Sequence, residues 1–492
     1  MSTDVINLIF GMKLRQARLE ANLSLTEFAA RAELSPSYVT EMEKGRKYPK
    51  PDKIVKMAHV LGKAYDELVS IKLNPALAYL ENMLSSPLLR HFPFEEFELD
   101  PNELVGLFTK APDKASALLH AIWEIARQYD MKDEHFFRAA LRSYQEIHDN
   151  YFPEIEEEAE AFAAKYQLNL FPVRIEQLKQ ILQQQFGYRV DETSLADHEL
   201  LSHYRAVYID TPRKTLLINP NLYELQRKFI LARELGYAAL GLNERSVTST
   251  PDQVLSFRQV SNDFKASYFG GALLMPRQPM IADISTLFNQ TTWSAEPLLA
   301  MLNHYDVTPE MLLYRFSEVI PAAFGISLHF LRFHNVDGSY KLIKRINMNR
   351  LLLPSGIGLH EHYCRRWLAS RLLINLAEQS GPQHQPLVDV QISQFLESQD
   401  RFLDIGFARP LVLTPTVGSS VVVGFRFTPE LSKVIKFGDD PAIHRTVIHE
   451  TCQRCPIDDC AVRKSVPTVL WGEQLRDRRN AAIAEIRRTL LP

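Results

Sequence analysis

Cysteine is scarce in this sequence, which makes the positions of the four cysteines informative. Cys452, Cys455 and Cys460 form the pattern C-x2-C-x4-C, and the fourth is Cys364. A disulfide framework is disfavoured because no signal peptide precedes the chain, which predicts a reducing compartment. Inert core cysteines are disfavoured because the residues between the three are largely polar. Four thiols with none to spare suit one metal ion or cluster.

Other features are absent as well. No apolar run approaches the ~20 residues of a membrane helix, and no apolar segment follows basic residues at the N-terminus. Internal repeats and low-complexity tracts are also lacking, and the net charge of −3 favours neither acidic nor basic partners. Hydrophobic residues make up 46% of the chain and charged residues 23%. We therefore expect a cytoplasmic protein of roughly three domains.

Residues 8–70 have the pattern of five short helices. Ser24 is a favourable N-cap with Glu27 at the capping-box position. Ser35 caps the third helix, Pro36 stands at its first position, and Gly45 follows its end. Apolar residues of the first helix recur at Ile9, Met12, Leu14 and Ala17. Two helices joined by a tight turn predict a helix-turn-helix domain.

The residues S-P-S-Y-V-x2-M-E-K-G-R-x2-P, at positions 35–49, resemble the XRE/Cro-type helix-turn-helix family. The resemblance implies DNA binding, with groove-facing residues Ser35, Ser37, Tyr38, Thr40 and Glu41. It also implies phosphate contacts from Lys13, Arg15, Lys44, Arg46 and Lys47. Leu25 stands where the family often has glutamine, so one phosphate contact is lost and Leu25 is expected to pack. A protein-binding module is the alternative.

Residues 8–70 hold eleven basic and eight acidic residues, a net charge of about +3. Such a small excess predicts weak binding by a monomer, so we expect a homodimer on a two-fold operator in double-stranded DNA. Residues 71–155 are expected to form a helical linker and dimerisation region. The acidic run from Glu154 to Glu160 is expected to solvate a helix face.

Residues 156–320 show a strand pair near 206–209 and 215–219, followed by a helix. That helix contains Arg233-Glu234-x2-Tyr237 and resembles the active-site helix of the ImmA/IrrE-type zinc peptidases, whose motif is H-E-x-x-H. Asp263 stands near the position of the family's acidic third ligand. Arginine cannot bind zinc and tyrosine is a poor substitute. We therefore expect a degenerate, non-enzymatic peptidase fold, with Glu234 in a structural ion pair. The alternative is a metallopeptidase that acts on a partner repressor.

Residues 322–492 begin with a predicted hairpin. Residues 325–333 alternate as a strand, Asp337-Gly338 marks a turn, and residues 340–346 return. Further strands are expected at 411–414 and 421–427. The last helix, from about residue 470, combines a helical apolar period with five arginines, which are expected to form a solvated face or an anion contact.

The hairpin, Cys364-x2-Trp367 and the C-x2-C-x4-C motif together resemble the C-terminal domain of the short-chain fatty-acyl-responsive transcriptional regulators. The resemblance implies that Cys364, Cys452, Cys455 and Cys460 hold an iron–sulfur cluster of the [4Fe–4S] type, and that the effector is an acyl-CoA. Spacing alone leaves zinc open. His362, His444 and His449 could replace or tune a ligand. Arg365-Arg366 departs from the family's usual sequence, so ligand specificity is not carried over.

The expected fold class is mainly α with an α+β sensor part. It comprises a five-helix head, a helical linker, a degenerate zincin-like α+β domain and a C-terminal α+β domain with a four-cysteine site. The expected function is that of a dimeric transcriptional regulator that senses a metabolite, a redox signal or both.

Overall fold

The computed structural model describes residues 3–43, 45, 47–70, 131–168, 171–210, 213–249, 254–351, 353–354, 360–379 and 385–490. The chain divides into two compact units, one of residues 1–144 with 254–258 and the other of residues 145–253 with 259–492. Most of the predicted linker, residues 71–130, lies outside the described residues. Within the described ranges, no helix has the length and apolarity needed to cross a membrane. The fold class is as predicted, mainly α with α+β parts.

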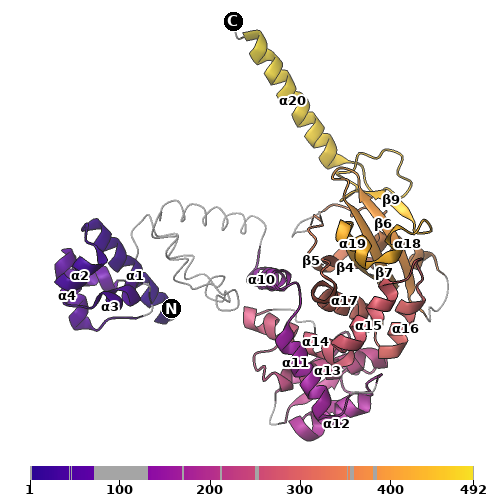
Figure 1. Cartoon of the computed structure of the whole chain (residues 1–492), viewed down its shortest axis with the longest axis horizontal. Helices are drawn as coiled ribbons and strands as arrows, with labels where there is room; N and C mark the ends of the chain where they lie inside the picture. Colours follow the sequence, from indigo (N-terminus) through magenta and orange to yellow (C-terminus); the bar gives the residue numbers. More distant parts are fainter. Residues whose placement is uncertain are drawn as a thin grey trace. The chain divides into compact units, whose positions relative to one another are not determined.

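The first unit contains the predicted five-helix head (Figure 1). Its helices are α1 (Thr3–Glu20), α2 (Leu25–Arg31), α3 (Pro36–Glu43), α4 (Pro51–Leu61) and α5 (Tyr65–Val69). The predicted capping box is present, because Ser24 and Glu27 exchange hydrogen bonds before α2. Ser35 caps α3 by accepting from the Tyr38 amide at 3.2 Å. A single core around Phe28 and Met42 joins the helices.

Helix α3 is held against α1 by a buried ion pair and a close backbone approach. Arg18 donates to both carboxylate oxygens of Glu43, at 2.6 and 3.0 Å, and to the Leu23 carbonyl at 2.8 Å. A Cβ on Gly11 would lie only 2.3 Å from the Met42 carbonyl oxygen, so only glycine fits there. The position of α3 therefore depends on residues outside the helix-turn-helix motif.

The second unit begins with helices around a small mixed sheet. Strand β3 pairs in parallel with β1 and antiparallel with β2. The elements are α11 (Pro153–Lys165), α12 (Ile175–Phe186), β1 (Arg189–Asp191), β2 (Ala206–Ile209), β3 (Thr215–Ile218), α13 (Glu224–Ala239), α14 (Phe257–Leu274), α15 (Arg277–Phe288), α16 (Glu296–Tyr305) and α17 (Pro309–Phe324). Helix α10 (Asp133–Ile147) spans the division between the units. The predicted pair β2–β3 and the following helix α13 are confirmed.

A buried ion network joins α11, α14 and α17, and it corrects one prediction. Glu156, within the acidic run expected to face solvent, is only 1% exposed. It receives two hydrogen bonds from Arg315, at 2.7 and 2.8 Å, and one from the Tyr268 hydroxyl at 2.7 Å. Arg315 also pairs with Glu318 at 3.0 Å. A charge run indicates solvation only where tertiary packing supplies no counter-charge.

The C-terminal part is built on a six-stranded sheet in the order β5-β4-β8-β7-β6-β9. Its strands are β4 (Leu328–Val336), β5 (Ser339–Asn347), β6 (Leu387–Phe395), β7 (Arg401–Pro410), β8 (Gly418–Arg426) and β9 (Arg445–Ile448). The hairpin turn at Asp337-Gly338 is confirmed, with φ of 50° and 77°. The strand expected at 411–414 is wrong, because that segment is the turn between β7 and β8.

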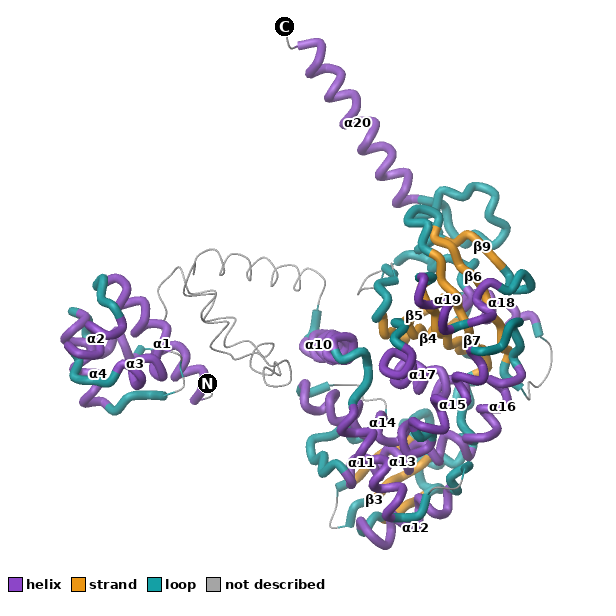
Figure 2. The backbone as a smooth tube through the Cα atoms, in the orientation of Figure 1, coloured by secondary structure: helices purple, strands orange, loops and turns teal. Residues whose placement is uncertain are grey.

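Helices pack on both faces of this sheet, as the tube view shows (Figure 2). Phe330 contacts Tyr314 of α17, whereas its neighbours Leu331 and Phe333 join the core under α18 (Leu368–Glu378). Because α17 packs on the sheet, the predicted boundary at 320–322 falls inside a helix, and the two predicted domains lie in one compact unit. Shorter elements α19 (Pro429–Val434) and η2 (Lys436–Asp439) precede β9, and α20 (Thr468–Leu490) ends the chain.

Candidate functional sites

The expected groove-facing residues lie on and just before α3. Ser35 and Ser37 are exposed, whereas Tyr38, Thr40 and Glu41 are half-buried. The Thr40 hydroxyl donates to the Pro36 carbonyl at 2.9 Å. Short polar side chains at the first turns of α3 leave this face open to a base edge or a phosphate.

The expected phosphate-contacting residues divide into three groups. Lys47 is exposed and Arg15 half-buried, so both keep the predicted role open. Lys13 instead donates to the carbonyls of Glu67 and Ser70, at 3.1 and 2.5 Å, where its charge complements the C-terminal end of α5. Lys44 and Arg46 lie outside the described residues.

Two further residues complete this face. Leu25 packs against the head core, which agrees with the expected loss of a polar contact there. Lys53 of α4 lies with its ammonium 4.8 Å from the centre of the Tyr38 ring, which adds a cation beside α3. Sequence reasoning missed Lys53, because its position beside Tyr38 follows only from the packing of α4.

Three of the four residues of the predicted degenerate peptidase site are hydrogen-bonded to one another, namely Arg233, Tyr237 and Asp263. A Cβ on Gly236 would meet the Ala266 carbonyl oxygen at 2.7 Å, so glycine permits α13 and α14 to approach closely. Arg233 donates to the Tyr237 hydroxyl at 3.0 Å, and that hydroxyl donates to Asp263. Burial and the Asp263 charge raise the pKa of Tyr237 well above its usual range, which keeps the phenol protonated.

Glu234 forms the expected ion pair, and its partner is Arg245. Two hydrogen bonds of 2.7 and 2.6 Å join them, and the guanidinium stacks between Tyr208 and Tyr237, 3.9 and 3.8 Å from the ring centres. Both side chains are nearly buried. Glu234 therefore has no free oxygen directed at a water or metal without breaking this pair. Arg245 lies eleven residues downstream, and no sequence pattern identified it.

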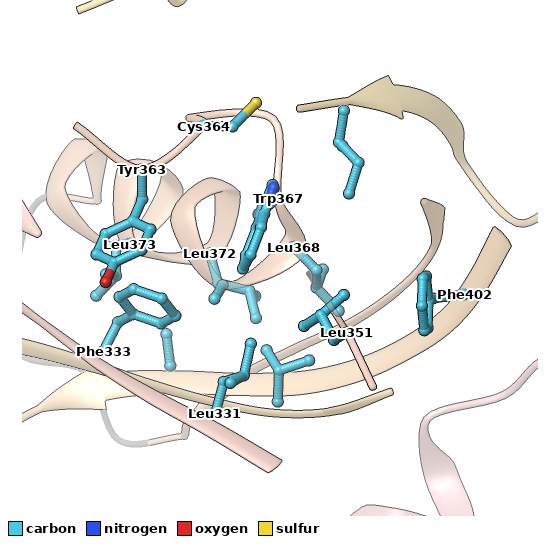
Figure 3. Close-up of a cluster of buried hydrophobic side chains, with 14 of the residues drawn as sticks. Leu331, Phe333, Leu351, Tyr363, Cys364, Trp367, Leu368, Leu372, Leu373 and Phe402 are labelled. Atoms are coloured by element: carbon cyan, nitrogen blue, oxygen red, sulfur yellow. The ribbon is translucent and has the colours of Figure 1, made fainter. Parts of the chain in front are cut away.

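The cysteines come from two segments that pair through their backbones. Cys364 precedes α18, and the other three lie between β9 and α20. The Cys364 amide donates to the Glu450 carbonyl at 3.2 Å, and the Cys452 amide donates to the His362 carbonyl at 2.8 Å. Figure 3 shows the Cys364 thiol at the edge of the α18 core, directed away from Leu372. The fold therefore brings the backbone segment of Cys364 beside that of Cys452.

All four thiols are free, and three of them are buried. Burial raises the pKa of Cys364 to about 11, and Cys452 and Cys455 add to the shift, while backbone hydrogen bonds at Arg366 and His449 oppose it. Burial also raises the pKa of Cys455, and the Arg463 charge opposes that shift. The thiols are thus close enough to interact electrostatically. Among the described residues, no three Cys, His, Asp or Glu side chains converge as ligands of one metal ion.

Basic residues hold the cysteine loop. Arg463 donates to the carbonyls of Cys452 and Cys455, at 2.9 and 3.0 Å, and to that of Ile457. The Lys464 amide donates to the Cys452 sulfur at 3.5 Å. Backbone donors and cations around sulfur stabilise thiolates.

The three histidines proposed as alternative ligands are not part of this cluster of thiols. His362 bonds to Gln453 at 2.9 Å, and His449 lies 3.4 Å from Glu397. Burial lowers the pKa of His444, which lies near Arg371 and Asp389. Among the described residues, His449 Nδ1 is buried without a hydrogen-bond partner.

Comparison with known proteins agrees with this organisation. The helix-turn-helix family matches residues 14–68, and the IrrE N-terminal-like domain family matches residues 183–317. The HTH-type transcriptional regulator RamB of Mycobacterium tuberculosis, from strains CDC 1551 / Oshkosh and ATCC 25618 / H37Rv, is 23% identical over 477 residues. The match spans 92% of this chain and 93% of RamB. The chain therefore contains an XRE-type helix-turn-helix domain and an IrrE-like domain, which supports a DNA-binding transcriptional regulator.

A solved structure of a Mycobacterium tuberculosis transcriptional regulator is also similar to this regulator. The two are 18% identical with a TM-score of 0.47, and the match covers 66% of this chain and 92% of that chain.

The regulator also contains a cavity of about 240 Å³ in its second unit, between α13, α17 and β4. Four arginines line it, Arg205, Arg315, Arg332 and Arg409, together with Lys344 and the two carboxylates Glu310 and Glu318. Glu310 pairs with Arg409 at 2.7 Å, and Glu318 pairs with Arg315 at 3.0 Å. Although burial opposes its ionisation, Arg409 and Arg332 lower the pKa of Glu310 to about 2. In the described part of the chain, the Arg205 guanidinium has neither a hydrogen bond nor an ion pair. The cavity therefore carries excess positive charge.

Apolar side chains form much of the remaining wall, including Phe229, Ile230, Met275, Met311 and Phe330, and uncharged polar side chains such as Gln226 and Thr308 complete it. Sequence reasoning did not find this cavity, because its residues come from segments between positions 205 and 409. The sequence around an arginine in a strand or loop does not indicate whether its side chain will face another arginine.

Proposed function

We propose that this regulator binds an operator as a homodimer and is controlled by a metabolite, by an iron–sulfur cluster, or by both. The helix-turn-helix domain supports the first part, because a head of low positive charge gains affinity and specificity from two half-sites. A signal in the second unit would act by changing the fit of two heads to half-sites ~34 Å apart. The proposed location is the cytoplasm.

Two variants of the helix-turn-helix head test the DNA proposal, because they should differ in sequence specificity and in salt dependence of binding. Replacing the exposed Ser37 with alanine should weaken operator binding roughly 5- to 100-fold, with little change on unrelated DNA, because a base contact specifies sequence. Lys47→Ala should weaken binding to operator DNA and to unrelated DNA by a similar factor. It should also reduce the slope of log affinity against log salt concentration by about one. Gel-shift titrations at several salt concentrations measure this. Unchanged operator affinity in both variants would contradict the assignment of this face.

We propose a [4Fe–4S] cluster bound by Cys364, Cys452, Cys455 and Cys460, with zinc as the alternative. Four free thiols from two paired segments, with cations and backbone donors around them, support it. Cluster ligands bind different iron atoms and need not converge on one point. A bound cluster would supply sensitivity to oxidation, and the role of this chain's residues is to hold it beneath the start of α20.

The visible spectrum of protein purified without air is the decisive measurement, with iron, sulfide and zinc assayed on the same sample. We expect broad brown absorption with matched iron and sulfide, lost in Cys455→Ser. Ser465→Ala is a matched control outside the ligand set. A colourless protein with one zinc per chain would instead identify a structural zinc site.

We propose that the cavity binds the effector, an anion with a short apolar part such as a short-chain acyl-CoA. Its unpaired guanidinium at Arg205 carries this proposal, because guanidinium binds phosphate and carboxylate in bidentate geometry. The adjacent apolar wall suits a short acyl chain.

Arg205→Met should weaken binding of propionyl-CoA about 10- to 100-fold in calorimetric titration, because one charge-assisted contact contributes ~1.5–3 kcal/mol. The exposed Arg189 serves as the matched control, and Arg189→Met should bind normally. Titrations with free CoA and with propionate measure separately how much the CoA part and the acyl part of the ligand contribute to binding. If Arg205→Met and wild type bound propionyl-CoA with equal affinity, the proposal that this cavity binds the effector would be wrong.

We propose that the IrrE-like domain is a non-catalytic scaffold. The Glu234–Arg245 pair and the ligand-position residues Arg233 and Tyr237 support this. Zinc bound at Glu234 and Asp263, with proteolysis lost in Glu234→Gln, would restore the metallopeptidase alternative.

A further inference from the structure

Helix α20 carries an apolar stripe that no described part of the chain covers. Residues 471–489 are all exposed, including Trp471 at 52%, Leu475 at 42% and Ile486 at 57%. Together with Ala482, these residues follow one another at intervals of 4, 7 and 4. At 100° per residue they occupy a sector of about 60°, the width of a helix-pairing seam. Figure 1 shows α20 as one continuous helix.

A helix of this kind needs a partner. Its first turn is anchored to the described part of the chain, because the amides of Val469 and Leu470 both donate to the Gln453 carbonyl at 3.1 Å. Most helical stability in proteins comes from packing of an apolar face rather than from intrinsic propensity. The stripe is therefore expected to be buried in the functional assembly.

We propose that α20 pairs in antiparallel fashion with α20 of a second copy of this chain. A two-fold axis between residues 478 and 479 would place Trp471 opposite Ile486 of the second copy, and Leu475 opposite its Ala482. Larger side chains then meet smaller ones on both sides of the axis, as close packing requires. Arg478 and Arg479 lie beside the axis and flank the stripe. The proposal rests on the homodimer proposed above and names its interface.

Charge distribution favours antiparallel over parallel pairing. The helix carries five arginines, Arg476, Arg478, Arg479, Arg487 and Arg488, against three acidic residues. Parallel pairing would place identical arginines at the same level, where they repel. Antiparallel pairing brings like charges level only at the axis, where Arg478 lies opposite Arg479 of the second copy. It brings Arg487 and Arg488 of one copy within about a turn of Glu473 of the other, and it opposes the helix dipoles.

The length of α20 suits a modest dimer interface. A helix of 23 residues is ~34 Å long and ~10 Å wide, with a lateral surface on the order of 1,100 Å². A facing helix covers roughly half of it, so two copies bury about 1,000 Å² in total, near the lower limit for a specific interface. Two half-sites in DNA would reinforce such a dimer by raising the effective concentration of the second head.

Sedimentation of the full chain tests the pairing. Wild type should be dimeric at micromolar concentration, and Leu475→Asp should raise its dimer dissociation constant at least about 100-fold, because it places a charge in the seam. Ala484→Asp adds the same charge to the opposite face and should leave the dissociation constant within about twofold. Circular dichroism of both variants reports whether the fold is retained.

Cross-linking tests the direction. Leu475→Cys and Ala482→Cys chains, oxidised as a mixture, should give a cross-linked dimer that neither gives alone, with wild type as the background control. Cross-linking of each variant by itself would indicate parallel pairing and overturn the arrangement. A dimer that persists in Leu475→Asp would overturn the α20 interface while leaving the dimeric regulator intact. A monomeric wild type would overturn both.

Discussion

Arg18→Met is expected to unfold the DNA-binding head and to abolish operator binding without unfolding the second unit. Arg18 is nearly buried and holds Glu43, at the end of α3, through two hydrogen bonds. Removing it leaves a buried carboxylate without a counter-charge, which costs about 3–5 kcal/mol. A head of ~65 residues has a total stability of only about 3–10 kcal/mol. The substitution therefore removes most of that stability.

Proteolysis and thermal unfolding followed by circular dichroism measure this effect on the full chain. We expect rapid cleavage within residues 3–70 and loss of the head's share of the helical signal. Lys56→Met is the matched control, because Lys56 forms an exposed ion pair with Glu33 and its loss should leave the head folded. An Arg18→Met head as stable as that of the control would show that this buried pair does not hold α3.

Arg315→Met is expected to destabilise the second unit by about 3–5 kcal/mol, since it leaves Glu156 and Glu318 buried together without a counter-charge. Arg315 is fully buried and also donates to the Met275 carbonyl at 3.0 Å. Even beside Arg315, burial raises the pKa of Glu318 to about 7. The midpoint of thermal unfolding should fall by at least about 5 °C.

The pH dependence of this loss has a defined sign. Without Arg315 the folded-state pKa of both carboxyls rises above the unfolded value, so the folded state binds more protons and stability decreases as pH increases. The deficit should therefore be smaller at about pH 5 than at about pH 8. Arg426→Met, which removes the partly exposed partner of Asp400 outside this network, is the control and should change the midpoint little. A deficit independent of pH would exclude orphaned carboxylates as its cause.

Local sequence signals predicted the head correctly. Ser24, Glu27, Ser35 and Pro36 determine helix starts through contacts within four residues, so their effect is readable without tertiary structure. The hairpin turn at Asp337-Gly338 was predictable for the same reason, because its positive φ angles require those residue types. Cysteine spacing likewise indicated a shared site, which the pairing of residues 362–364 with 450–452 brings together.

Charge pairing could not be predicted from sequence. In the sequence, Glu156 is one of several acidic residues in a run. In the structure it is buried and receives hydrogen bonds from Arg315, which lies 159 positions away. The Arg245 partner of Glu234 and the role of Lys13 at the end of α5 depend equally on distant packing. Whether a charged side chain is solvated or paired is decided by where its counter-charge lies in space.

By itself, the sequence determined the helix-turn-helix head and the absence of histidines at positions 233 and 237, because each depends on residue type and short spacing. A four-cysteine site remains a prediction from the sequence. Only the tertiary structure decided that Glu234 forms an ion pair with Arg245. It also decided that Arg205 faces a cavity and that its guanidinium has no ion-pair partner among the described residues. It alone showed that the apolar stripe of α20 lies uncovered in the described chain. These properties arise from contacts between segments up to about 200 residues apart. The free energy of such a contact depends on burial and on distance in space, and spacing along the chain encodes neither.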